Sequence, residues 1–181
     1  MYDPRLIEIG KLDAAEQQLK TATRLWFYDI EPISAHSLAF AAYEVIHAVS
    51  KALNPNRPEL LLDSSLINPV FRVAVNRRFK KAANFFKHAD NDPHDKIDFM
   101  QGLTWCFIYY SIYGLQLSGR ELIDEFVLFQ NWVAFNFPDK LTEESRRHYL
   151  DGLTVEHLAR VRAMSRKEFF DEGLAFLRAG G

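Results

Sequence analysis

The chain has a single cysteine, Cys106, and no long uninterrupted apolar run. One cysteine excludes an internal disulfide, and its place in an apolar segment is typical of a thiol that packs as a small hydrophobic side chain. The longest apolar stretch, residues 103–117, is interrupted by polar residues and glycine and is shorter than the roughly 20 residues that span a bilayer. Residues 1–13 lack the basic-then-apolar layout of a signal peptide. We therefore expect a cytoplasmic protein that does not interact with membranes.

Several chemical motifs are also missing. The sequence contains no glycine-rich phosphate loop, no Cys-x-x-Cys pair and no nucleophile elbow. These absences argue against P-loop nucleotide hydrolysis, thioredoxin-like redox chemistry and α/β-hydrolase chemistry. The formal net charge of −2 also gives no overall attraction to nucleic acid or membranes. Any binding of an anion must come from a local group of charges.

The sequence has many hydrophobic residues that can form a core. Of the 181 residues, 48% are hydrophobic and 14% aromatic, which is enough for one buried core. The apolar residues recur at helical spacing almost throughout, and no useful strand-like alternation occurs. The sequence predicts an all-α protein: an antiparallel helical bundle with additional short C-terminal helices. We expect a single domain over 1–181, with the core bundle at about 4–137 and a helical extension at about 140–179.

Capping signals predict where helices begin and end. The expected starts are Asp3-Pro4, Ser34, Asn68-Pro69, Ser118 with Glu121, and Ser165 with Glu168. Proline just after a polar cap is favourable at the first helical position, and the serine–glutamate pairs have capping-box spacing. Pro138 is expected to end the helix before it. The second helix is expected to bury Leu38, Ala42, Val45, Val49 and Leu53.

The segment 71–87 is unusually basic. It carries six cations and no acid: Arg72, Arg77, Arg78, Lys80, Lys81 and Lys87. At 100° per residue, Arg77, Lys81, Asn84 and His88 form one row, opposite a stripe of Phe71, Val75, Phe79, Ala82 and Phe86. The row predicts a phosphate-binding surface in which Arg77, Lys80 and Lys87 bind the anion and His88 exchanges protons near pH 7. The alternative is an ordinary surface helix whose last cations complement its dipole.

The run Asn84-Phe-Phe-Lys-His88-Ala-Asp90, in an all-helical chain of this size, resembles the HEPN superfamily, in particular its abortive-infection-like branches. Many members of that family are metal-independent RNases or nucleotide-binding partners in toxin and defence systems. The resemblance implies a catalytic set of His88, Asn84 and Lys81, in which His88 is the general base or acid and Asn84 holds the family's polar position. The chain departs from the family where an arginine is expected: Ala83 precedes Asn84, and the nearest preceding cation is Lys81. Lysine neutralises a phosphate but lacks the planar fork of arginine.

A second polar group is predicted on the helix that precedes this segment. His36, Glu44 and His47 project within about a quarter-turn of one another, and Glu44 and His47 have Glu-x-x-His spacing. Two histidines and a carboxylate can hold one divalent metal ion. The alternative is polar decoration of a solvent-facing side, or of a subunit contact that covers Phe40 and Tyr43.

Three functional hypotheses follow. The first is a HEPN-like domain that binds RNA or nucleotide phosphate. In one form of this hypothesis the domain also cleaves RNA without a metal ion. The second is a non-catalytic interaction domain that forms a homodimer, and the third is a helical bundle with a His/Glu metal site. Only the third requires a cofactor, a divalent metal. The sequence leaves open whether the protein is an enzyme.

Overall fold

The structure is a computed structural model that describes residues 6–65, 67–87 and 94–180. Within these ranges it has eight α-helices, three short 3-10 helices and no strand, which confirms the predicted all-α class. The α-helices are α1 Lys11–Phe27, α2 Pro32–Leu53, α3 Pro69–Lys87, α4 Thr104–Leu117, α5 Asp124–Asn136, α6 Glu143–Leu150, α7 Val155–Ala163 and α8 Arg166–Arg178. The 3-10 helices are η1 Leu61–Asp63, η2 Gln101–Leu103 and η3 Pro138–Lys140.

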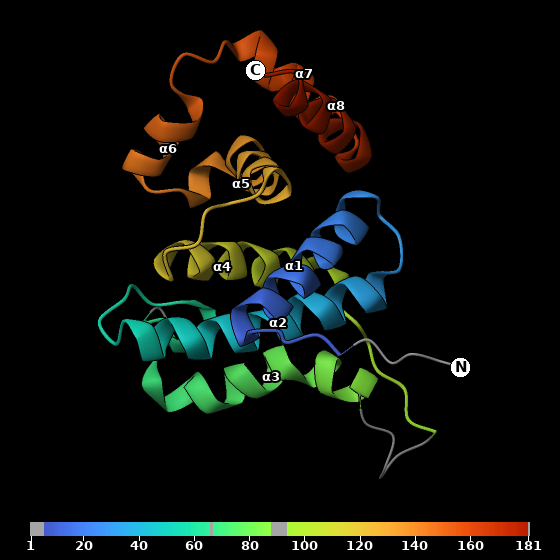
Figure 1. Ribbon diagram of the computed structural model, residues 1–181, viewed down its shortest axis with the longest axis vertical. Helices are drawn as coiled ribbons and strands as arrows, with labels where there is room; N and C mark the ends of the chain where they lie inside the picture. Colours follow the sequence, from blue (N-terminus) through green and yellow to red (C-terminus); the bar gives the residue numbers. More distant parts are fainter. Residues whose placement is uncertain (1–5, 66, 88–93, 181) are drawn as a thin grey trace.

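The helices lie in successive layers along the long axis of the molecule (Figure 1). α3 packs on one side of α2, whereas α1 and α4 contact α2 elsewhere, and α5 lies beyond them. α6, α7 and α8 lie at the far end, where α8 packs against α5 and α1. α2 is therefore covered by three other helices, while α3 is at the edge of the stack.

The core is rich in aromatic rings. Phe27, Phe107 and Phe129 are fully buried, and Phe170 of α8 stacks on Phe27 of α1 with ring centroids 4.5 Å apart. Burying each such ring contributes about 1.5–3 kcal/mol relative to leaving it exposed. The Phe27–Phe170 stack ties the last helix of the chain to the first.

The buried side of α2 differs from the predicted one. Its buried side chains include His36, Phe40, Tyr43 and Ile46, whereas Leu53 is 63% exposed. The prediction placed His36, Phe40 and Tyr43 opposite the core. It was wrong because helical periodicity groups residues by angle but does not say which side the neighbouring helices cover.

The predicted helix starts are partly confirmed. α3 begins at Pro69, with the Asn68 side chain accepting from the Val70 N–H at 3.0 Å, and α8 begins after the Ser165–Glu168 capping box. α5 ends at Asn136, before Pro138.

Three other starts were wrong. Residues 6–10 are not helical and α1 begins after Gly10, while α2 begins at Pro32 rather than at Ser34. Ser118 ends α4 instead of starting α5, because Gly119 adopts a left-handed φ of 76° and turns the chain out of the helix.

None of the helices in the described ranges has the length and hydropathy needed to cross a membrane.

Candidate functional site

The basic residues lie on α3, a helix that buries few of its side chains against the rest of the protein. Ala83 is its one buried residue, and Val70, Phe71 and Val73 at its start are largely exposed. The predicted apolar stripe therefore covers the bundle only from about Phe79 onward, where Phe79 and Phe86 contact aromatic rings beneath them. Arg77, Arg78 and Lys81 remain exposed to solvent.

A cavity of about 500 Å³ lies between α3 and residues 97–103. Its charged walls are Arg77, Arg78, Lys81 and Asp98, so three cations face one carboxylate. Within the described part of the chain, none of the three cations has an ion-pair partner. Among the described residues, these three positive charges therefore outnumber the single negative charge of Asp98 in the cavity wall, which favours an anionic ligand.

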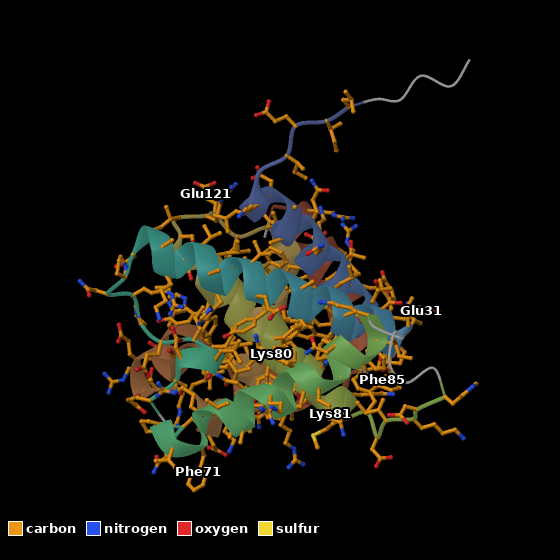
Figure 2. All side chains as sticks on the ribbon, turned by 90° about the horizontal axis from the view of Figure 1, so that it is seen from below. Glu31, Phe71, Lys80, Lys81, Phe85 and Glu121 are labelled. Atoms are coloured by element: carbon orange, nitrogen blue, oxygen red, sulfur yellow. The ribbon has the colours of Figure 1, made fainter. Side chains whose placement is uncertain are left out.

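The predicted phosphate-binding residues lie in two places: some line the cavity, and others contact α2. Arg77 and Lys81 line the cavity, while the Lys80 ammonium lies 2.9 Å from a Glu44 carboxylate oxygen. The Lys87 ammonium lies 5.5 Å from the centre of the Phe40 ring. Figure 2 shows Lys80 on the α2 side of α3 and Lys81 on the other side. Lys80 and Lys87 therefore help to attach α3 to α2, and Arg77 and Lys81 face the cavity.

Of the other two members of the predicted catalytic set, the structure describes only Asn84. Asn84 is exposed on α3 and does not line the cavity. His88 lies outside the described residues, as do Asp90 and Asp92. The proposed roles of Asn84 and His88 stay predictions.

His36 of α2 also lines the cavity. It is 1% exposed and enclosed by aromatic rings, with centroid distances of 4.9 Å to Phe99 and 5.4 Å to Phe107. Its Nδ1 lies 3.0 Å from the Thr104 hydroxyl, and its Nε2 has no hydrogen-bond partner among the described residues. Burial lowers the pKa of His36 to about 4, so the ring is neutral at pH 7.

The residues proposed as metal ligands are held apart by other partners. His36 pairs with Thr104, Glu44 with Lys80, and His47 lies 3.2 Å from Asp63. No group of three histidine, cysteine, aspartate or glutamate side chains in residues 6–65, 67–87 and 94–180 could hold a metal ion. The three side chains therefore do not form one centre.

His47 instead belongs to a polar cluster that fastens the loop after α2. Arg57 donates to Asp63 at 3.0 Å and to the Pro58 carbonyl at 2.7 Å, and Asp63 accepts from the Leu60 N–H at 2.6 Å. Burial lowers the pKa of His47, and the nearby Asp63 opposes this effect. Burial alone would raise the pKa of Asp63, but the Leu60 N–H and the His47 and Arg57 side chains hold it below its usual value. This cluster has a structural role.

Sequence reasoning missed two contributors to the cavity, Arg78 and His36. Ala74, Arg77, Arg78 and Lys81 follow the spacing i, i+3, i+4, i+7, so this face of α3 was visible in the sequence. His36 carried no such signal, because its contact with Thr104 joins residues 68 positions apart.

Comparison with known proteins identified no relative: no protein-family model, no curated protein and no solved structure matches the chain. The functional argument therefore relies on the cavity itself.

Proposed function

We propose that the protein binds the phosphate groups of RNA or of a nucleotide in the basic cavity beside α3. The observation that carries the proposal is the set of three unpaired cations, Arg77, Arg78 and Lys81, around a cavity of about 500 Å³. This volume is within the ~300–1,000 Å³ usual for ligand pockets. A group with two or more negative charges would complement the three cations better than a neutral ligand.

His36 supports the same function. A neutral imidazole can donate one hydrogen bond from Nε2 when the Thr104 hydroxyl donates to Nδ1. In that tautomer the buried Nε2–H lacks a partner, and a phosphate oxygen that reached it after a small movement of the surrounding rings would supply one. The two arginines add planar forks that match phosphate oxygens in bidentate contacts.

The test compares two double variants that remove the same charge. Arg77→Ala/Lys81→Ala alters the cavity, whereas Lys51→Ala/Lys140→Ala removes two exposed cations elsewhere. With a fluorescent single-stranded RNA, the cavity variant should bind at least about tenfold more weakly at low salt. Its plot of log affinity against log salt should also be less steep, by about one unit for each phosphate that the protein no longer neutralises. The control should bind like wild type, and equally weakened binding by both variants would refute the proposal.

RNA cleavage is the enzymatic extension of this proposal, based on the resemblance to HEPN domains. It assigns proton transfer to His88 and a polar contact to Asn84. Incubation with mixed RNA should then give cleavage by wild type without added metal, and His88→Ala should cleave much more slowly while binding equally well. If the wild-type protein binds RNA but does not cleave it, the nuclease hypothesis is refuted and the RNA-binding proposal stands.

A further inference from the structure

A second cavity, of about 410 Å³, shares a wall with the basic one. Residues 100–104 separate the two: Gln101, Gly102 and Thr104 line the second cavity, while Met100 and Leu103 line the first. The neighbouring positions 35 and 36 of α2 are divided in the same way, with Ala35 in the second cavity and His36 in the first. A ligand that fills the basic cavity therefore lies next to this one.

All three tryptophans of the chain line this second cavity: Trp26 from α1, Trp105 from α4 and Trp132 from α5. Phe137 stacks on Trp105 with ring centroids 5.3 Å apart and an angle of 18°, so a ligand that stacks on Trp105 would use its other face. The guanidinium carbon of Arg166 lies 4.4 Å from the Trp26 ring centre. Indole faces and a guanidinium plane are the surfaces on which proteins stack unpaired bases.

The charge of this cavity suits a neutral ligand. Asp29 and Arg166 are the charged residues of its wall, and they form an ion pair with each other. Gln101 and Thr104, which are polar and uncharged, also line this cavity. A flat, neutral ring with polar edges fits these walls, and a nucleobase has that chemistry.

Thr104 also connects the two cavities chemically. It lines the tryptophan cavity, and its hydroxyl pairs with His36 Nδ1, whose ring lines the basic cavity. The basic cavity and the tryptophan cavity are thus linked by one buried hydrogen bond, between Thr104 and His36. Single-stranded nucleic acid is commonly bound by this combination of basic surface and aromatic stacking.

We propose that the tryptophan cavity binds a nucleobase of the ligand whose phosphates occupy the basic cavity; this inference rests on the proposed function. The ligand chemistry is an aromatic base carried by a phosphate group, and its source is either a free nucleotide or single-stranded RNA.

The test uses intrinsic tryptophan fluorescence, because every tryptophan of the chain lines this cavity. The probes are a short oligoadenylate, AMP, and ribose 5-phosphate as a phosphate without a base. The base-containing probes should change the fluorescence, and ribose 5-phosphate should not. A response to AMP as strong as that to oligoadenylate identifies a nucleotide, and a response to oligoadenylate alone identifies RNA; both outcomes support the inference.

Variants separate this inference from the proposed function. Trp105→Leu should weaken oligoadenylate or AMP binding about tenfold, as removal of one stacked base predicts, and leave ribose 5-phosphate binding unchanged. Arg77→Ala/Lys81→Ala should weaken both kinds of probe. Tyr149→Leu, a partly buried aromatic that lines neither cavity, is the matched control and should change neither.

The failures are also distinct. If labelled oligoadenylate binds wild type and Trp105→Leu equally and leaves wild-type fluorescence unchanged, the nucleobase site is refuted while phosphate binding stands. If no probe binds wild type, both proposals fail. The wild-type fluorescence titration decides the question even if Trp105→Leu does not fold.

Discussion

At the scale of single residues, burial determines the protonation state of His36. The ring is enclosed by Phe99 and Phe107, and this loss of solvation lowers its pKa from 6.5 to about 4. The folded protein therefore holds a neutral imidazole at pH 7 beside Arg77, Arg78 and Lys81, which line the same cavity. Protonation of the ring would require burying a further positive charge there.

The first prediction is a pH-dependent stability that His36 causes. Because its folded pKa is depressed, the stabilising contribution is complete above about pH 6.5 and is lost as the pH falls toward about 4. Between pH 7 and pH 5 the free energy of unfolding should drop by about 2 kcal/mol more in wild type than in His36→Gln. Urea denaturation at both pH values measures the difference. Parallel decreases in the two proteins would contradict the assignment.

A second prediction concerns the contact between α2 and α4 at Gly114. A Cβ at this position would lie 2.6 Å from Ile46 Cγ2 and 3.2 Å from Leu60 Cδ1, and both neighbours are fully buried. We expect Gly114→Ala to lower the free energy of unfolding by about 1–3 kcal/mol, despite the better helix propensity of alanine. Gly102→Ala is the control, since nothing lies within 4 Å of its Cβ. If urea denaturation shows that Gly114→Ala is more stable than wild type, the prediction is wrong, because α2 and α4 can then move apart enough to accommodate the Cβ.

At the scale of elements, α3 buries fewer residues than its neighbours α2 and α4. α2 buries eight residues and α4 buries seven, whereas α3 buries Ala83 alone. Polar contacts hold much of it in place: Asn76 donates to the Leu62 carbonyl at 3.0 Å, and Lys80 pairs with Glu44. Exposed ion pairs and single hydrogen bonds contribute little free energy compared with buried rings.

The third prediction is therefore faster amide exchange in α3. Hydrogen-exchange mass spectrometry should show that peptides from α3 exchange at least about tenfold faster than those from α2 and α4, because local opening of α3 exposes little apolar surface. Oligoadenylate should slow exchange in α3 if its phosphates bind there. Equal protection of α3 and α4 without ligand would contradict this account of how α3 is attached.

At the scale of the whole molecule, the start of α3 leaves an apolar surface uncovered. Val70, Phe71 and Val73 are 82%, 61% and 71% exposed, and Figure 2 shows Phe71 at the edge of the molecule. Clustered exposed hydrophobic side chains are typical of protein interfaces. They favour the homodimer of the second functional hypothesis, which stays a prediction.

The fourth prediction tests that homodimer. Sedimentation at micromolar concentration should give the mass of two chains for wild type and of one chain for Phe71→Glu, because a buried carboxylate would be unfavourable at the interface. Glu144→Lys, on the distant α6, is a control for changing the charge of an exposed residue and should leave the mass unchanged. A monomeric wild type would remove the dimer from consideration.

Helical periodicity and capping residues were sufficient to predict the all-α class, the start of α3 at Pro69, the capping box of α8 and the end of α5 before Pro138. These features depend on local chemistry: backbone groups at helix ends need partners, and proline lacks an N–H. The starts of α1 and α5 were misplaced, since Gly10 and Gly119 interrupted patterns that also looked helical. The start of α2 was misplaced because Pro32, rather than Ser34, opens the helix after Glu31, which has a left-handed φ of 47°.

By itself, the sequence determined that the protein is helical and that a dense group of cations lies on one of its helices. Only the tertiary structure decided which of them face a cavity: it turned Arg77, Arg78 and Lys81 toward residues 97–103 and used Lys80 and Lys87 against α2. It also buried His36 against Thr104 and brought three tryptophans together from α1, α4 and α5. The physical reason is that periodicity specifies angles around one helix axis, whereas a site depends on which neighbouring helices cover each side.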